Sequence, residues 1–171
     1  LLCHKEYLIR GEKENYDADE KRIETSDAED IIKVNLGLAL NNVQITKGTD
    51  LREAIDLNPI YFDLDKSFIR KDAEIELQKV IAVLKQYPNM KIDIRSHTDS
   101  RSSTAYNDAL SERRNHATRD YIANVGGISR DRLTGRGYGE RQLTNRCSDG
   151  VECSEAEHQA NRRSEFIVMS L

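Results

Sequence analysis

The sequence has no uninterrupted apolar run near the roughly 18 residues that a membrane-spanning helix requires. It also has no basic excess, because 26 Lys and Arg side chains stand against 30 Asp and Glu side chains, a net charge of −4. We therefore expect no membrane insertion by this fragment and no binding to nucleic acid. The 33% of charged and 37% of hydrophobic residues, the latter in periodic clusters, are typical of a water-soluble globular domain.

The motifs of common enzyme classes are missing as well. No Gly-x-Ser-x-Gly elbow, metal-binding helix or phosphate-binding glycine loop occurs. The glycines of residues 135–139 are expected in a strand and turn, which is the wrong context for a nucleotide site. His97 and Asp99 could belong to a hydrolase triad, but they flank one residue at a strand end and no nucleophile is fixed opposite them. We expect no catalytic residues, no cofactor and no metal.

Cysteines are few, and two of the three are close in sequence. Cys147 and Cys153 bracket a polar segment with a turn-forming Asp-Gly pair, so their thiols can reach each other. A disulfide would stiffen the loop and imply an oxidising compartment such as the periplasm. The alternative is half of a zinc site, although His158 stands alone and no second ligand pair follows. Cys3 has no obvious partner.

Residues 1–50 predict a β-rich segment that is too small to bury a core of its own. Residues 5–10 read as a strand and residues 11–30 as a charged loop. Apolar residues alternate over 34–40, which predicts a half-buried strand, and a turn precedes renewed alternation within 41–45. The chain begins without Met or a targeting segment, so we expect an excised fragment. Its first 50 residues would then be the tail of an upstream β domain and a connector.

The remainder, residues 51–171, predicts one domain in which strands and helices alternate. Helices are expected at 71–87, ended by Pro88, and at 107–124, where Leu110, Ala117 and Tyr121 form an apolar stripe and Gly126-Gly127 ends the helix. Strands are expected at 60–64, 91–97, 133–138 and 165–169. This β-α-β-α-β-β order predicts an α+β fold, an α/β sandwich with helices packed on a small mixed sheet.

Residues 96–114 contain the charged side chains that we consider as candidate binding residues. Asp99 follows a predicted strand, where loops present functional side chains on a rigid scaffold. Arg114 shares a helical stripe with Leu110, so its guanidinium is drawn toward an apolar face and needs an anion. One interpretation is a structural ion pair between Arg114 and Asp99 or another carboxylate. The other is that the two charges are held apart, so that Arg114 binds the carboxylate and Asp99 the ammonium of a zwitterion.

Over residues 58–170 the sequence resembles the OmpA-like C-terminal domain. The resemblance rests on Ile60–Ile69, His97-Thr-Asp99, Tyr106-Asn107, Leu110-Ser111, Arg114, Gly135–Glu140 and Asn161–Glu165, which occur in the family's order. It implies non-covalent binding of peptidoglycan through the meso-diaminopimelate of the stem peptide. Asp99 and Arg114 would hold its side-chain amine and carboxylate, and neighbouring contacts would fall on Phe62, Asp63, Thr98, Asn107, Leu110 and Arg162.

Some of these contacts have alternative roles. Asp63 could cap a strand end, Arg162 could belong to a surface ion pair, and Leu110 is expected as core or pocket wall. Ser96 and Ser102-Ser103 stand where the family usually carries Gly, which would alter the loop at the pocket mouth.

The Cys147–Cys153 loop and the final strand are similar to the version of this domain found in Bacteroidetes. That similarity implies a periplasmic location, with attachment to the outer membrane through the rest of the parent protein. It also implies a role in anchoring a complex, such as the type IX secretion apparatus, to the cell wall. The expected partners are the peptidoglycan stem peptide and other cell-envelope or secretion-system proteins. The alternatives are a periplasmic protein-interaction module and the wall-anchoring tail of an outer-membrane β-barrel.

Overall fold

The computed structural model describes residues 1–12, 17–27, 31–37, 45–62 and 66–171. The chain divides into two compact units, Leu1–Val43 and Gln44–Leu171.

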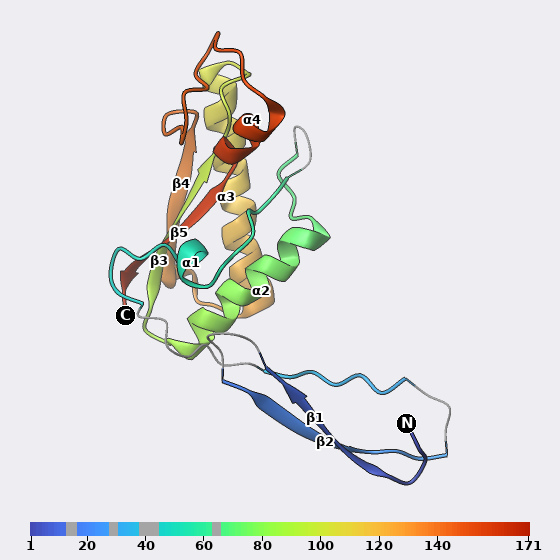
Figure 1. Cartoon of the computed structure of the whole chain (residues 1–171). Coiled ribbons are helices and arrows are strands. Elements are labelled where there is room, and N and C mark those ends of the chain that lie inside the picture. The colour runs from blue at the N-terminus through green and yellow to red at the C-terminus, as the bar shows by residue number, and fades with distance from the viewer. Residues whose placement is uncertain (13–16, 28–30, 38–44, 63–65) are drawn as a thin grey trace. The chain divides into compact units, whose positions relative to one another are not determined.

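The N-terminal unit contains an antiparallel pair of strands, β1 (Glu6–Gly11) and β2 (Asp19–Glu24) (Figure 1). The strand predicted at 5–10 is confirmed. The prediction that residues 11–30 form a loop is wrong, because β2 lies within them.

Charge pairs explain why β2 showed no apolar alternation. Arg10 on β1 lies 3.1 Å from Glu20 on β2, and Arg22 on β2 lies 3.0 Å from Glu6 on β1. Opposite charges on neighbouring strands stabilise a pair whose side chains are mostly solvated. A charged strand of this kind has no hydrophobic period for sequence analysis to detect.

Residues 31–37 have no strand assignment, so the predicted strand at 34–40 is not found in its described part. Side chains of β2 hold this segment instead. The backbone N–H of Gly37 donates to the Asp19 carboxylate at 2.7 Å, and the Lys21 ammonium donates to the Asn35 carbonyl. The turn predicted at 41–42, like all of residues 38–44, lies outside the described residues.

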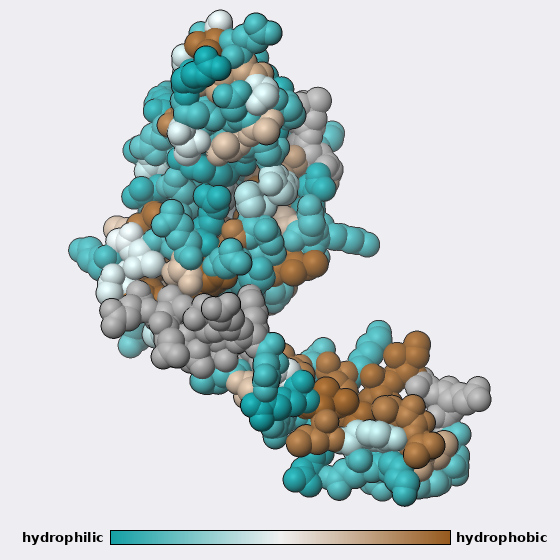
Figure 2. Space-filling model, viewed as in Figure 1, coloured by the Kyte–Doolittle hydropathy of each residue, from teal (hydrophilic) through white to brown (hydrophobic). Residues whose placement is uncertain are grey.

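Several large apolar side chains of the N-terminal unit remain exposed, and Figure 2 shows them gathered on one side of it. Leu8 is 56% exposed and Ile31 is 82% exposed. A two-stranded pair is marginal in water without further apolar cover.

The C-terminal unit is built on a three-stranded mixed sheet in the order β4-β3-β5. The central strand β3 (Lys91–His97) runs parallel to β4 (Leu133–Gly139) and antiparallel to β5 (Ser164–Ser170) (Figure 1). These bounds agree with the predicted strands to within one residue, and the α+β class with a small mixed sheet is confirmed.

A fourth predicted strand, at 60–64, is wrong in its described part, because Ile60 to Phe62 have no strand assignment. Backbone from an earlier segment occupies the outer edge of β5 instead. The N–H of Gly48 donates to the Val168 carbonyl at 2.8 Å, and the N–H of Val168 donates to the Thr49 carbonyl at 2.9 Å. Asp50 then caps the short helix α1 (Leu51–Ala54), which contacts β5.

Two long helices pack with this sheet, and both were predicted. Helix α3 (Thr104–Gly126) lies along β3 and β4, and α2 (Lys71–Gln86) packs against α3 (Figure 1). Helix α3 begins three residues before its predicted start because the Ser103 hydroxyl caps its first turn. Gly127, with φ of 68°, ends it. No described helix is both long and apolar enough to cross a membrane.

The face that α3 turns to the sheet is more polar than predicted. Ala117 and Tyr121 of the expected stripe are only half-buried, whereas Ser111, Asn115 and Thr118 are fully buried. Small hydrogen-bonded side chains suit this face because the helix approaches the backbone of β4 closely. A Cβ added at Gly137 would lie 2.3 Å from the backbone nitrogen of Glu112.

A fourth helix, α4 (Glu155–Asn161), stands where sequence analysis expected a loop. It begins with a capping box in which the Ser154 hydroxyl accepts from the N–H of Glu157, while the Glu157 carboxylate accepts from the N–H of Ser154. The Ser-x-x-Glu spacing was visible in the sequence. The helix is short, and its apolar residues are too few to show a period.

Candidate ligand-binding cleft

A cleft of about 560 Å³ lies among the loop that follows β3, the N-terminal half of α3, helix α4 and Phe62. Its volume is in the range of small-molecule sites. The side chains that line it are Phe62, Thr98, Asp99, Arg101, Ser102, Tyr106, Asn107, Leu110, Arg114, Glu155, Gln159 and Arg162. The structure therefore brings together all the predicted contacts that it describes. Asp63 lies outside the described residues.

The loop after β3 is held in place from both sides. The N–H of Thr98 donates to the Gly139 carbonyl at 2.9 Å, which continues the pairing of β3 with β4. From α3, the side-chain amide of Asn107 donates to the carbonyls of Asp99 and Ser102, each at 3.1 Å. Asn107, predicted as a ligand contact, thus fixes the loop that carries Asp99.

Asp99 is bound to two arginines. Its Oδ2 lies 2.8 Å from Nη2 of Arg101 and 2.5 Å from Nη1 of Arg162. The carboxylate of Asp99 thus has two arginine partners in this structure, and its binding to the cation of a ligand stays a prediction. Burial raises the pKa of Asp99, but hydrogen bonds from Arg101 and Arg162 lower it more, so the carboxylate is ionised at neutral pH.

The two arginines share a second carboxylate, that of Glu155 in the first turn of α4. Nη1 of Arg101 lies 2.7 Å from it and Nη2 of Arg162 lies 2.5 Å from it. Asp99, Arg101, Glu155 and Arg162 therefore form a closed ring of alternating charge. The ring joins the loop after β3 to α4. Arg162 is a member of this ion-pair ring as well as a lining residue of the cleft.

Arg114 lies on the α3 wall of the cleft and is 6% exposed. Its Nε donates to the Lys66 carbonyl at 3.1 Å, and its guanidinium carbon lies 4.9 Å from the centre of the Phe62 ring. Burial, together with the charge of Arg162, lowers the pKa of Arg114 to about 10, while the charge of Asp99 opposes this. Arg114 therefore remains a cation at neutral pH, in a site where a cation is poorly hydrated.

Two further predicted contacts complete the wall. Leu110 is 6% exposed and supplies apolar surface, as expected for a pocket wall. The Thr98 hydroxyl is buried without a hydrogen-bond partner among the described residues. A buried hydroxyl of this kind is available to a ligand.

His97, considered as a member of a hydrolase triad, contacts Glu165 and Tyr138. Its Nε2 lies 3.6 Å from the Glu165 carboxylate, and its ring stacks on Tyr138 with 5.4 Å between centroids. His97 and Asp99 therefore take part in separate sets of contacts.

The model of the OmpA family matches residues 61–157, more than half of the chain. The chain belongs to the OmpA family.

Curated relatives agree with this assignment, and a solved structure agrees with the fold. The chain is similar to the peptidoglycan-associated lipoprotein of Brucella melitensis, with 41% identity over 109 residues, which are 64% of this chain and 61% of that protein. Outer membrane porin F of Pseudomonas aeruginosa is 38% identical over 81 residues, 47% of this chain and 23% of that protein. The chain thus spans less than two thirds of either relative. In fold it is similar to the peptidoglycan-associated lipoprotein from Burkholderia pseudomallei, with a TM-score of 0.58, 24% identity, and coverage of 67% of this chain and 92% of that one.

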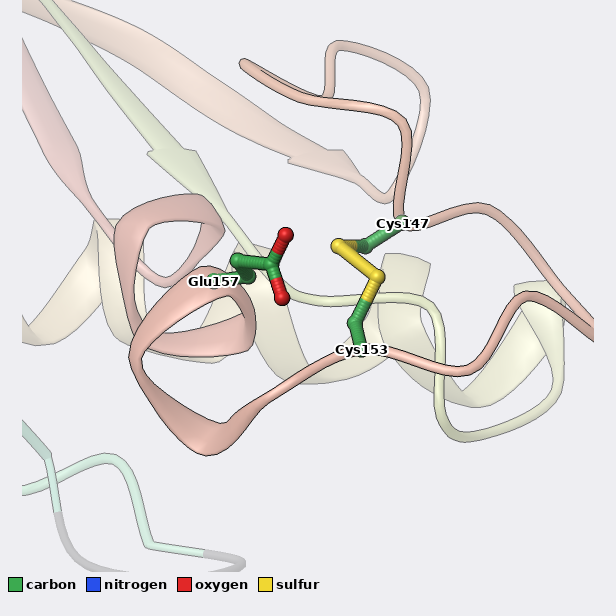
Figure 3. Close-up of side chains that lie close together, drawn as sticks. All are labelled: Cys147, Cys153 and Glu157. Carbon is green, nitrogen blue, oxygen red and sulfur yellow. A yellow bond between two sulfur atoms is a disulfide. The ribbon is translucent and has the colours of Figure 1, made fainter.

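In this OmpA-family chain the Cys147–Cys153 disulfide is formed, and Figure 3 shows it next to Glu157. The three side chains are close enough to hold a metal ion. The sulfurs are bonded to each other, however, and are not the thiolates that such an ion would need. The Ser100 hydroxyl donates to the Cys147 carbonyl at 2.6 Å, which connects the disulfide loop to the loop of Asp99.

Three further side chains line the cleft that the sequence pattern did not indicate: Arg101, Glu155 and Gln159. Arg101 lies two residues after Asp99, and its proximity alone gave no sign that it would fold back onto that carboxylate. Glu155 and Gln159 were missed because α4 was expected to be a loop. Had the capping box been recognised, their spacing of four would have placed both on one helical face.

Proposed function

We propose that the C-terminal unit binds peptidoglycan without cleaving it and so attaches its parent protein to the cell wall. The observation that carries this proposal is the composition of the cleft. Asp99 and Arg114, of opposite charge, line the same cavity as the apolar side chains of Phe62 and Leu110. This combination suits a zwitterion at the end of an aliphatic chain. The name of the Brucella relative, a peptidoglycan-associated lipoprotein, supports it.

The recognised group in this proposal is the meso-diaminopimelate of the stem peptide, whose side chain ends in a carbon bearing an ammonium and a carboxylate. Arg114 binds the carboxylate through its planar guanidinium, and Asp99 binds the ammonium. The burial of Arg114 favours an anionic ligand, because a poorly hydrated cation gains more from an anion than a solvated one does.

The remaining predicted residues have supporting roles in this proposal. Thr98 offers its hydroxyl to the ligand, and Leu110 and Phe62 contact the aliphatic chain. Asn107 and Arg162 hold Asp99 in position. Asp63, which follows Phe62 in the sequence, is proposed as a further ligand contact.

Sedimentation with purified cell-wall sacculi tests the proposal. The wild-type protein should sediment with sacculi and release no soluble fragments. Asp99→Ala and Arg114→Ala should each remain in the supernatant, while circular dichroism shows that each variant is folded. Arg130→Gln is the matched control, because Arg130 is an exposed arginine paired with Asp120 outside the cleft.

Other outcomes of this assay point to other functions. Release of soluble fragments would indicate a hydrolase. A wild-type protein that stays in the supernatant would indicate a protein-interaction module. Unfolding of the Asp99→Ala or Arg114→Ala variant would indicate that the residue has a structural role.

The location proposed for the domain is the periplasm, with attachment to the outer membrane through the rest of the parent protein. The Cys147–Cys153 disulfide supports an oxidising compartment. We further propose that the parent resembles PorE, a lipoprotein of the type IX secretion apparatus, and that envelope or secretion proteins are its partners. The tail of an outer-membrane β-barrel is the second candidate, favoured by the relative named outer membrane porin F.

For residues 1–50 we propose the tail of an upstream β domain and a connector. The exposed apolar side chains of the N-terminal unit, such as Leu8 and Ile31, support this proposal because further strands would cover them.

A further inference from the structure

Oδ2 of Asp99 accepts more donors than one carboxylate oxygen accommodates well. Nε of Arg101 lies 3.2 Å from it, Nη2 of Arg101 2.8 Å, and Nη1 of Arg162 2.5 Å. A carboxylate has about four lone-pair sites over its two oxygens. The other oxygen, Oδ1, accepts the backbone N–H of Arg101 at 3.3 Å. Since Oδ2 already receives three of these donors, an ammonium that binds to Oδ2 takes the place of an arginine N–H group.

The two arginines differ in how firmly they are held. Arg162 is the C-terminal capping residue of α4, and its side chain is 21% exposed. Its guanidinium donates to Glu155 and Gln159 of the same helix. The Arg101 side chain is 47% exposed and extends from a loop. Its second partner, Glu155, is 67% exposed, and exposed ion pairs contribute little. Arg101 is therefore the arginine that a ligand ammonium displaces from the Asp99 carboxylate.

A guanidinium displaced from Asp99 is still a cation beside the cleft, where it can bind an anionic group of the ligand. The cleft, at about 560 Å³, is larger than one amino-acid side chain and has room for a neighbouring residue of the ligand. In a stem peptide, diaminopimelate follows a glutamyl residue that is linked through its γ-carboxyl, so the glutamyl α-carboxyl group is free unless it is amidated. A guanidinium binds a carboxylate far better than an amide, because the charge strengthens both hydrogen bonds.

Building on the proposed function, we propose that Arg101 is a specificity-determining residue. It leaves Asp99 when the diaminopimelate ammonium binds there, and its guanidinium then binds the α-carboxylate of the preceding glutamyl residue. The domain thereby distinguishes stem peptides with a free glutamyl carboxylate from amidated ones.

Calorimetry with two synthetic tripeptides tests this inference. Both are alanyl-γ-glutamyl-meso-diaminopimelate, one with the glutamyl α-carboxylate and one with the α-amide. The wild-type chain should bind the carboxylate form about 10-fold more tightly, the scale of one charge-assisted hydrogen-bonded contact. Arg101→Gln should bind both forms equally, and it should bind the amide form a few-fold more tightly than the wild type does, because the competing guanidinium is gone.

Two further variants separate specificity from a structural effect. Arg101→Lys keeps the charge without the planar fork and should retain a reduced preference of roughly 3-fold. Arg130→Gln should behave as the wild type. Circular dichroism of each variant confirms its fold.

The inference fails if the wild type binds both tripeptides equally, or if Arg101→Gln weakens both to the same degree. If the wild type binds neither tripeptide, the proposed function itself fails. Binding of both forms with no preference leaves the proposed function standing and rejects the role of Arg101.

Discussion

Oδ2 of Asp99 lies 2.5 Å from Nη1 of Arg162, a contact that joins residues 63 positions apart in the sequence. It connects the loop after β3 to the last turn of α4, the two elements that carry most of the polar side chains of the cleft. Because Arg162 also binds Glu155, the carboxylate of Asp99 is oriented from the α4 side. A ligand that reaches Asp99 therefore exchanges one ionic contact for another.

Arg114 should determine the preference for diaminopimelate over lysine at the third position of the stem peptide. Lysine lacks the terminal carboxylate, so the wild type should bind its peptide roughly 10- to 100-fold more weakly, as for the loss of a charge-assisted contact. Arg114→Gln should remove this preference. Calorimetry with the two peptides measures it, and equal wild-type affinities would contradict the assignment of the carboxylate to Arg114.

Loss of the disulfide should weaken both stability and binding. Helix α4 begins directly after Cys153, so the disulfide fixes the start of the helix that carries Glu155 and Arg162. The Cys147→Ser/Cys153→Ser double variant should lose about 2 kcal/mol for this short loop, and its Tm should fall by roughly 5–10 °C. Calorimetric melting of wild type with and without reductant provides the comparison. An unchanged Tm in both tests would mean that the loop is held by other contacts.

Gly137→Ala should destabilise the fold by pushing α3 away from β4. The added Cβ would lie 2.3 Å from the backbone nitrogen of Glu112, and backbone cannot move aside as a flexible side chain does. We expect a loss of about 1–3 kcal/mol in urea unfolding. Gly37→Ala is the matched control, because its nearest neighbour would be the Asp19 carboxylate at 3.9 Å. Equal effects of the two substitutions would refute the close approach.

Glu165 should make stability depend on pH under acidic conditions. The approach of His97, whose Nε2 lies 3.6 Å from the Glu165 carboxylate, together with the ion pair between Glu165 and Arg163 at 2.7 Å, lowers the pKa of Glu165 from 4.5 to about 2, against the opposing effect of burial. A lowered pKa stabilises the folded state above the unfolded pKa, and this contribution is lost as pH falls from 4.5 toward 2.

The measurement is urea unfolding of wild type and Glu165→Gln through that pH range. The difference between their free energies of unfolding should shrink as the pH falls. A constant difference would show that Glu165 acts through packing rather than through its charge.

The elements found from sequence are those whose pattern reflects burial against the sheet or the helices. Strand β3 alternates Ile92, Ile94 and Ser96 toward the interior, and helix α2 repeats its buried residues at steps of three and four. Such periods arise from the geometry of the strand or helix itself, so they can be recognised in the sequence without knowledge of the fold. Their bounds were correspondingly accurate.

The elements that were missed are stabilised by contacts distant in sequence. Strand β2 is held by charge pairs with β1, and Gly48 and Thr49 pair with β5 although more than a hundred residues separate them. Neither kind of contact leaves a hydrophobic period. The strand predicted at 60–64 had the right composition, but residues 48 and 49 are the ones that pair with the edge of β5.

In the candidate cleft, too, some features were predicted from the sequence and others were missed. The family's motifs led to the residues that line it, including Asp99, Arg114 and Leu110. They did not reveal the ring of ion pairs, because Arg101 and Glu155 come from a loop and an unrecognised helix. Ion-pair partners depend on side-chain reach in three dimensions, which spacing along the chain does not encode.

The pairing of Gly48 and Thr49 with β5 also bears on self-association. Exposed strand edges offer unsatisfied N–H and C=O groups to other molecules and promote aggregation. A domain cut at Leu51, where the sequence pattern changes, would lose this natural cover and leave β5 open along Val168. Keeping the residues from Gln44 onward retains the cover, so a few residues without regular secondary structure protect the β5 edge of the sheet from pairing with another copy.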